Sequence, residues 1–311
     1  MIHRFVLGCG NFGGIGSAPD FFGQGESDEE AFAIMDAGWA LGLRWFDTAD
    51  AYGGGRSESA VGAWMRRTGN RPQITTKTFN PMEVGADHGL ARDRILRQIE
   101  TSLERLGVDS VDLYLAHGHD PDTPLAETMG AFEELVERGH VAAYGVSNFD
   151  ALQLEEALAT GRPSLIQNSY SLLDRADGEG SNGASNTVLL SLCSEHGIRY
   201  QAFSPLAGGW LSGKYRRGAA APPGSRMTMR PEPYLHLDDE RVYAGLERLA
   251  AEADSRGVST AALALAWIVS DPRVDSAVVG PRRPEHLEAI REAAVLELSA
   301  ADRERIGSLF P

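Results

Sequence analysis

Three side chains that together can move a proton follow consecutive strand-like runs of this chain. Asp47 ends one apolar run, Tyr52 lies on the loop five residues later, and Lys77 ends the next run. Lysine is rare here: Lys77 and Lys214 are the two lysines among 29 lysine and arginine residues, so its use indicates a need for a compact, tunable charge. An ammonium beside a phenol lowers the phenol's pKa from about 10. The group therefore predicts a tyrosine that gives a proton to a carbonyl oxygen.

A histidine can join this group, because His117 follows a further apolar run, Val111 to Ala116. Its ring could hydrogen-bond a substrate oxygen beside Tyr52. His117 and His119 together also suit a metal-dependent hydrolase of barrel fold, which needs further ligands after later strands. The later runs end instead in residues that form a poor ligand set for a divalent metal, so we expect no metal: Ser147, Asn148, Gln167, Ser204 and Gly280.

Lys77 would also serve as the nucleophile of a Schiff-base aldolase. Such a lysine must be neutral to attack, whereas Asp47 and Tyr52 favour its charged form. Taken singly, each of these residues has an ordinary structural explanation, such as a turn, a packed ring or a solvated charge. Their joint placement on successive strands is what favours proton transfer.

Eight short β-rich runs recur along the chain, and most are continuously apolar, as parallel strands covered on both faces are. They are Phe5–Cys9, Leu43–Asp47, Gln73–Lys77, Val111–Ala116, Val141–Val146, Leu165–Asn168, Ile198–Phe203 and Asp275–Val279. Amphipathic helical patterns lie between them, for example Ile95 to Leu106 before Gly107 and Leu125 to Val136 before Gly139. The alternation predicts a single-domain (β/α)8 TIM barrel over residues 1–311, with its active site at the carboxyl ends of the strands.

Two segments depart from a regular alternation. The stretch from Leu206 to Leu235 is rich in glycine, proline and arginine, and two helical patterns, Glu240 to Arg256 and Thr260 to Ser270, precede the last run. A loop of this length inside a compact domain is usually a lid or a binding loop.

Composition limits the class of partner. A formal charge of -15 over 311 residues disfavours nucleic acid and anionic membranes, and an anionic ligand would need a local cluster of arginines. Cys9 and Cys193 show neither disulfide nor zinc spacing, so we expect both in the core. No apolar run reaches the ~20 residues of a membrane helix, and Met1 to Phe5 lacks the apolar stretch of a signal peptide, which predicts a cytoplasmic protein.

The motifs around these residues resemble the aldo-keto reductase superfamily over essentially the whole chain. The matching segments are Asp47-Thr48-Ala49 through Tyr52-Gly53, Thr76-Lys77, and Asp112-Leu113-Tyr114 leading to His117. The resemblance implies a catalytic tetrad of Asp47, Tyr52, Lys77 and His117. It also implies that Tyr52 is the general acid in carbonyl reduction and that a nicotinamide supplies hydride.

The same resemblance implies the residues that contact the cofactor. The segments Gly145-Val146-Ser147-Asn148, Gln167-Asn168 and Ser204-Pro205-Leu206 to Gly213-Lys214-Tyr215 look like the family's carboxamide, ring-stacking and pyrophosphate contacts, and Phe203 matches the aromatic that packs on the nicotinamide. The full implied set is Asn11, Phe12, Asp47, Ser147, Asn148, Gln167, Phe203, Ser204, Pro205, Leu206, Gly208, Lys214, Arg226, Gly280, Arg282 and His286.

The phosphate end of the implied site contains arginines. The run from Pro222 to Arg226 resembles the cofactor loop of the branch that includes the potassium-channel β subunits, so 206–235 is expected to cover the cofactor. Gly280-Pro281-Arg282 looks like the adenosine phosphate site, and with Arg226 it predicts NADPH rather than NADH. The chain departs from relatives at its adenine end, with His286 where Gln is common and Ala289-Ile290 where Glu-Asn is common.

A second class stays open: a cofactor-binding redox sensor or auxiliary subunit with little turnover. The four filled tetrad positions, and the lack of an N-terminal segment to act as an effector, favour the enzyme. Aldehydes, keto-sugars and secondary-metabolite ketones all remain open as substrates, as does the oligomeric state. We expect four loops to set the choice, with Phe21, Phe22, Phe79 and Trp210 making the pocket partly apolar: Gly13–Gln24, Phe79–His88, His119–Thr123 and Leu206–Leu235.

Overall fold

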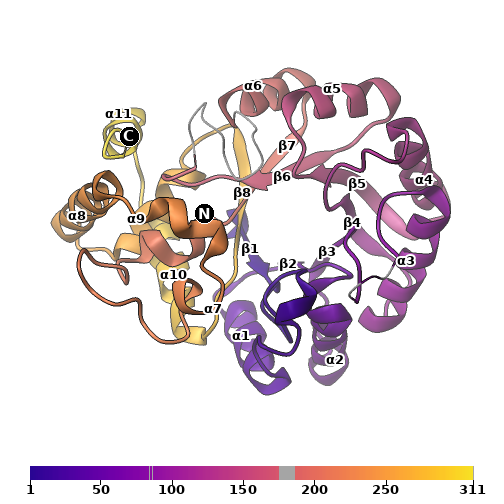
Figure 1. Cartoon of the computed structure of the whole chain (residues 1–311), viewed down its shortest axis with the longest axis horizontal. Coiled ribbons are helices and arrows are strands. Elements are labelled where there is room, and N and C mark those ends of the chain that lie inside the picture. The colour runs from indigo at the N-terminus through magenta and orange to yellow at the C-terminus, as the bar shows by residue number, and fades with distance from the viewer. Residues whose placement is uncertain (84, 86, 175–185, 311) are drawn as a thin grey trace.

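Eight parallel strands close into a barrel, which confirms the fold that the alternating pattern predicts (Figure 1). The computed structural model describes residues 1–83, 85, 87–174 and 186–310. The strands are β1 (Phe5–Gly8), β2 (Trp45–Asp47), β3 (Gln73–Thr78), β4 (Val111–Ala116), β5 (Val141–Ser147), β6 (Leu165–Ser169), β7 (Arg199–Phe203) and β8 (Val274–Val279). Each strand pairs with the next, and β8 pairs with β1 to complete the ring.

Helices cover the outside of the ring (Figure 1). They are α1 (Asp28–Leu41), α2 (Arg56–Thr68), α3 (Arg92–Leu106), α4 (Leu125–Glu137), α5 (Ala151–Thr160), α6 (Asn186–His196), α9 (Thr260–Val269) and α10 (Glu288–Val295). The two helices that the apolar spacing predicts are α3 and α4. Gly107 ends α3 with a φ of 70°, a left-handed conformation that glycine adopts without steric cost.

The start of β2 differs from the prediction for a local reason. The strand begins at Trp45 rather than Leu43. Gly42 ends α1 in the left-handed conformation, and the Leu43 amide donates to the Gly38 carbonyl at 2.9 Å. This pattern is a Schellman motif, so Leu43 completes the helix end instead of starting the strand.

Alternation along the strands fixes which side chains enter the barrel. A small apolar cluster of Leu113, Leu115 and Leu165, with Trp45 packed against it, is separate from the main core beneath the helices. Asp47 lies two residues after Trp45, so it shares that inward face. The same reasoning places a layer of polar side chains above the inner apolar cluster, at the carboxyl ends of the strands: Asp47, Lys77, Ser147, Gln167 and Gln201.

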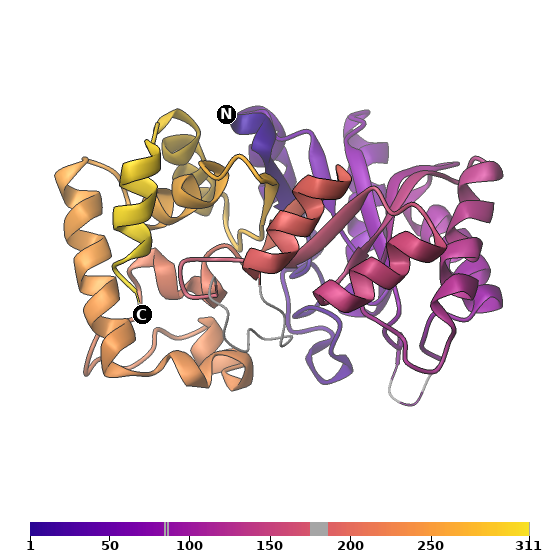
Figure 2. The same ribbon diagram turned by 90° about the horizontal axis from the view of Figure 1, so that it is seen from above.

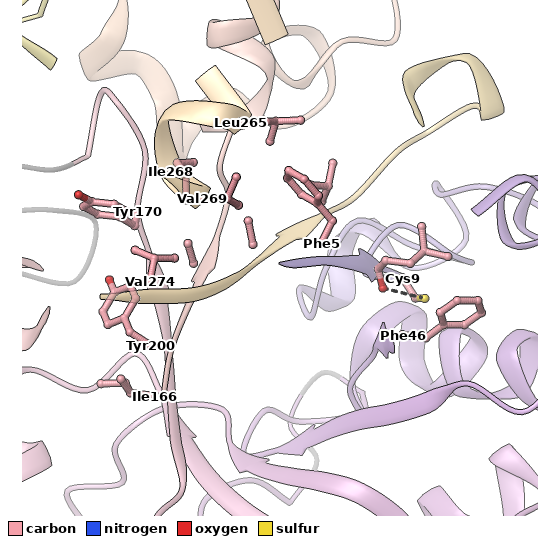
Figure 3. Packing of buried hydrophobic residues seen from close by; sticks show 14 of the residues in the cluster. Phe5, Cys9, Phe46, Ile166, Tyr170, Tyr200, Leu265, Ile268, Val269 and Val274 are labelled. Atoms are coloured by element: carbon pink, nitrogen blue, oxygen red, sulfur yellow. Dashed lines mark hydrogen bonds between the residues drawn. The ribbon is translucent and has the colours of Figure 1, made fainter. Parts of the chain in front are cut away.

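The additional helical segments thicken one side of the barrel. Each residue of α9 from Ala261 to Val269 is buried, as expected of a helix that is apolar all round. Figure 3 shows Leu265, Ile268 and Val269 of this helix near Phe5 of β1 and Val274 of β8.

Two helices outside α9 contribute to its burial, together with α10 and β8. They are α8 (Glu240–Ser255) and α11 (Ala300–Gly307), which lie side by side at one end of the molecule (Figure 2). Ion pairs between Arg305 and Glu252, and between Arg256 and Asp302, join them.

Both cysteines are core residues, as expected. Cys9 and Cys193 are buried free thiols. Among the described residues, no helix combines the length and apolar character that crossing a membrane requires.

Candidate active site

The structure brings the four tetrad side chains together at the carboxyl end of the barrel. The Lys77 ammonium donates to Asp47 Oδ1 at 2.5 Å and to the Thr48 carbonyl at 2.9 Å, and both ionised side chains are buried. Lys77 Nζ also lies 3.4 Å from the Tyr52 hydroxyl. On its other side, that hydroxyl lies 3.4 Å from His117 Nε2. One phenol therefore contacts a cation and an imidazole at once.

Glycines let the Tyr52 loop approach the loop after β1. A Cβ on Gly10 would lie 3.3 Å from the Tyr52 ring, and a Cβ on Gly14 would lie 2.6 Å from Gly53 Cα. Gly53 itself has a φ of 60°, in the region that favours glycine. The close contact of these two loops holds the Tyr52 ring in position.

The expected depression of the Tyr52 pKa is wrong for this structure. Burial raises the pKa of Tyr52 above its usual value, and the lowering effect of Lys77 offsets part of that rise. Burial also lowers the pKa of Lys77, but Asp47 and Tyr52 outweigh it, so the Lys77 pKa is raised. Asp47 neutralises the ammonium, which weakens its effect on the phenol. At neutral pH the phenol is therefore protonated and ready to act as an acid.

His117 is held as a neutral imidazole. Burial, with a smaller contribution from Lys77, puts the His117 pKa well below its usual range. The Asn80 side-chain amide lies 3.2 Å from Nδ1. When that amide donates to Nδ1, the ring proton is on Nε2, the nitrogen that faces Tyr52. His117 can then donate a hydrogen bond to the same oxygen that receives the Tyr52 proton.

We predict that His117→Ala lowers kcat/KM by roughly 10- to 100-fold, the scale for losing one hydrogen bond to a charged oxygen. His119→Ala is the matched control, because the His119 ring packs edge-on against Phe149, with centroids 5.5 Å apart, and does not line the cavity. Steady-state kinetics on both variants test the assignment. A larger loss in His119→Ala would contradict it.

A second buried carboxyl lies between Asp47 and Tyr52. Asp50 is fully buried; its Oδ2 accepts from the Thr78 hydroxyl at 2.7 Å, and its Oδ1 has no hydrogen-bond partner among the described residues. Burial, reinforced by the Glu58 carboxylate, raises the pKa of Asp50 to about 7. The folded protein therefore keeps a proton that the unfolded chain releases near pH 4.

This linkage predicts that stability falls as pH rises from about 4 through 7, because the stabilising contribution present at low pH is lost as Asp50 ionises. Asp50→Asn removes the ionisation and keeps an acceptor for Thr78. We expect it to raise the free energy of unfolding at pH 8 by up to about 4 kcal/mol, and by much less at pH 5. Denaturant titrations at both pH values measure this. An equal change at both would show that Asp50 does not titrate in this range.

A cavity of about 910 Å³ opens beside the tetrad. Of the residues that the resemblance implies, Phe12 does not line it and is a buried core side chain. The remaining residues of that set all line the cavity: Asn11, Asp47, Ser147, Asn148, Gln167, Phe203, Ser204, Pro205, Leu206, Gly208, Lys214, Arg226, Gly280, Arg282 and His286.

Polar side chains face the cavity beside Asp47. Gln167 Nε2 donates to Asp47 Oδ2 at 2.7 Å, and Ser147 Oγ donates to the Gln167 carbonyl at 2.7 Å. Asn148 and Ser204, at the ends of β5 and β7, have φ of 59° and 52°. Strained backbone of this kind is often found where a site must present particular groups.

The far end of the cavity gathers positive charge. Arg226 donates to Asn11 Oδ1 at 2.7 Å, and burial lowers the pKa of both Arg226 and Lys214. Among the described residues, neither of these cations forms an ion pair with a carboxylate. Arg282 differs, because its Nε donates to Glu26 Oε1 at 2.5 Å. In a chain of net charge -15, this cluster marks a local site for an anion.

The four aromatic residues that were expected to make the pocket partly apolar are not part of its lining, although the lining does include apolar side chains such as Phe203, Leu206 and Val279. Phe21, Phe22, Phe79 and Trp210 do not line the cavity, and Trp210 packs against Tyr215 in the core. Three of the four loops that we expect to set substrate choice contribute lining residues that individual inspection of the sequence missed: Ser17, Ala18, Asn80, Arg230 and Tyr234. The fourth, His119–Thr123, contributes none to the cavity lining. The positions of the missed residues in the sequence could have indicated them. Ser17 and Ala18 lie in the glycine-rich loop after the first strand, Asn80 follows Lys77, and Arg230 and Tyr234 lie in the arginine-rich loop. In the loop 79–88, residues 84 and 86 lie outside the described residues.

The chain belongs to the aldo/keto reductase family, whose sequence profile matches residues 6–310. It is 31% identical over 308 residues to the uncharacterized oxidoreductase YrpG of Bacillus subtilis, covering 93% of this chain and 90% of that protein. It is 34% identical over 283 residues to a probable voltage-gated potassium channel subunit beta of Arabidopsis thaliana, covering 86% of this chain and 82% of that one. The glycerol dehydrogenase AKR11B4 of Gluconobacter oxydans shares the fold, with a TM-score of 0.81. The two sequences are 24% identical, and the match covers 98% of this chain and 90% of the dehydrogenase chain.

Proposed function

We propose that this protein is an NADPH-dependent carbonyl reductase in which Tyr52 donates the proton. The observation that carries the proposal is the position of the Tyr52 hydroxyl, 3.4 Å from both Lys77 Nζ and His117 Nε2. The far end of the same cavity holds Arg226 and Lys214, which form no ion pair within the described part of the chain. The bound nicotinamide would supply the hydride. His117 Nε2 orients the carbonyl oxygen, and Tyr52 Oη protonates it as negative charge develops there.

The residues present fit a dinucleotide. Ser147, Asn148 and Gln167 offer side-chain hydrogen bonds for a carboxamide, and Phe203 offers a ring face. The loop after β7, including Lys214, would hold the pyrophosphate, and Arg226 and Arg282 would hold a 2′-phosphate. We propose that residues 206–235 cover the cofactor within a single domain and that the protein acts in the cytoplasm. At the adenine end Ile290 is buried, so a different residue must contact the base there.

Lys77 has two roles in this proposal. Its ammonium stabilises the phenolate that Tyr52 becomes after giving up its proton, and its bond to Asp47 fixes its position. Proton return to Tyr52 from solvent then completes the cycle. The same geometry permits the reverse reaction, in which the phenolate takes the proton of an alcohol.

We predict that wild-type protein binds NADPH at least about 100-fold more tightly than NADH, since two charge-assisted hydrogen bonds to the 2′-phosphate contribute roughly 1.5 to 3 kcal/mol each. Arg226→Ala should remove much of that advantage and change NADH affinity little. Exposed Arg283 is the matched control, and Arg283→Ala should change neither. Fluorescence titrations give the dissociation constants. Equal affinity for the two cofactors in wild type would contradict the assignment.

A second function keeps support from one finding, the 34% identity to a probable potassium channel subunit beta. An auxiliary or redox-sensing subunit would bind the same cofactor in the same cavity but turn over little. Because both functions predict NADPH binding, binding alone does not separate them. Sustained NADPH oxidation by an aldehyde or ketone favours the enzyme.

A further inference from the structure

Glu26 is a buried carboxylate at the phosphate end of the cavity. It lies just before Ser27, the N-cap of α1, and its side chain is 3% exposed. Its backbone is fixed to the loop after β1: the Glu26 amide donates to the Asn11 carbonyl, and the Gly13 amide donates to the Glu26 carbonyl, both at 2.9 Å. The position of its carboxylate therefore follows from the fold of the first loop.

The Glu26 carboxylate is only half satisfied. Its Oε1 accepts from Arg282 Nε at 2.5 Å, whereas its Oε2 is buried and has no hydrogen-bond partner among the described residues. Glu58, another fully buried glutamate, uses both oxygens, one with Thr76 and one with Arg105. Among the described residues, Arg282 is the one cation that hydrogen-bonds Glu26, and Arg282 lines the cavity.

Arg282 is held on two sides. Besides Glu26, it donates through Nη1 to the Gly224 carbonyl at 2.5 Å, which joins it to the loop after β7. The charged groups facing Glu26 are Arg282 after β8, Arg226 of α7 (Arg226–Met229) and Glu30 of α1. One carboxylate, that of Glu26, therefore already lies against the arginine that the proposed function gives to a 2′-phosphate.

We propose that Glu26 is a specificity-determining residue of the cofactor site: it holds Arg282 in place for a 2′-phosphate and takes up one proton from solvent as that phosphate binds. This inference rests on the proposed NADPH site. A phosphate dianion on Arg282 adds negative charge beside a carboxylate that is already poorly solvated. Burial raises the pKa of Glu26 even in the free protein, where Arg282 opposes the rise. Protonation relieves the repulsion that ligand binding would otherwise create.

The consequence is a pH-dependent preference for the 2′-phosphate. As pH rises above the pKa of Glu26 in the free protein, binding must be accompanied by proton uptake, so affinity falls. A ligand without the 2′-phosphate places no phosphate on Arg282. Its affinity should therefore not show the fall with rising pH that proton uptake by Glu26 causes. Glu26→Gln keeps an oxygen for Arg282 and removes the titration.

The experiment compares 2′,5′-ADP with 5′-ADP on the full-length protein by calorimetry between pH 5 and pH 8, in buffers of different ionisation enthalpy. We expect wild type to take up protons on binding 2′,5′-ADP at pH 8 and Glu26→Gln to take up none. The second measured quantity is the ratio of the dissociation constants for 2′,5′-ADP, wild type over Glu26→Gln. This ratio should rise at least about fivefold from pH 5 to pH 8. Glu29→Gln, an exposed glutamate three residues further along in α1, should behave as wild type.

The outcomes separate the two proposals. No proton uptake in wild type, or a pH-independent ratio of dissociation constants, would overturn the role of Glu26 and leave the NADPH site intact. Failure of wild type to prefer 2′,5′-ADP over 5′-ADP at any pH would overturn the NADPH site, and the Glu26 role with it. Should Glu26→Gln fold poorly, the proton count is repeated on His286→Gln, because the His286 ring lies beside Arg282 and also titrates. Proton uptake that remains in this variant supports the role of Glu26, and uptake that disappears overturns it.

Discussion

Replacing Tyr52 by phenylalanine is expected to lower kcat by about 10² or more while leaving NADPH affinity nearly unchanged, because the variant loses only the proton donor. The ring of Tyr52 packs against Gly10, and phenylalanine keeps that contact. Since burial raises the pKa of the Tyr52 phenol, the acid is fully protonated at neutral pH. Steady-state kinetics and cofactor titration on the same preparation measure both quantities.

Tyr215→Phe is the matched control, because that phenol lies on the loop after β7 and is absent from the cavity lining. It should keep wild-type kcat to within a few-fold. A Tyr52→Phe variant with wild-type kcat would show that another group supplies the proton.

Replacing Lys77 by methionine is expected to lose activity and to destabilise the fold by about 3 to 5 kcal/mol. The ammonium is fully buried, and its removal leaves the Asp47 carboxylate, which is 2% exposed, without a counterion. Gln167 still donates to Asp47 Oδ2, but a neutral amide does not replace the charge. Denaturant unfolding and turnover are the two measurements.

A second substitution separates the structural role of Lys77 from its chemical role. Adding Asp47→Asn to Lys77→Met removes the unpaired carboxylate, so it should recover part of the lost stability and none of the activity. If Lys77→Met retains some alcohol oxidation activity, the basic limb of its pH–rate profile should lie at higher pH than in wild type, since the Tyr52 pKa rises without the ammonium. Unchanged stability and an unmoved limb would contradict both roles.

The sequence was sufficient to predict the barrel and the position of the tetrad. Inward-facing residues alternate along each strand, so Asp47 at the end of β2 and Lys77 near the end of β3 had to face the same interior. Their contact then follows from the parallel register, in which Asp47 lies opposite Thr75, two residues before Lys77. Local patterns of this kind can be read without a structure.

Other features depend on the packing of distant segments. The contact of Glu26 with Arg282 joins residues 256 apart, and no local pattern indicates that they meet. The Tyr52 pKa depends on how completely the surrounding loops exclude water, which sequence spacing does not give. Trp210 illustrates the converse error, because a large aromatic in a loop can pack inward as easily as it can line a pocket.

The most direct test of the account is NADPH oxidation measured together with alcohol formation, across a panel of aldehydes, ketones and keto-sugars. We predict that at least one carbonyl compound is reduced with one NADPH consumed per alcohol formed, and that Tyr52→Phe loses this activity while still binding NADPH. Wild-type protein that binds NADPH but oxidises it with no member of the panel would contradict the carbonyl reductase and favour a sensing or auxiliary role.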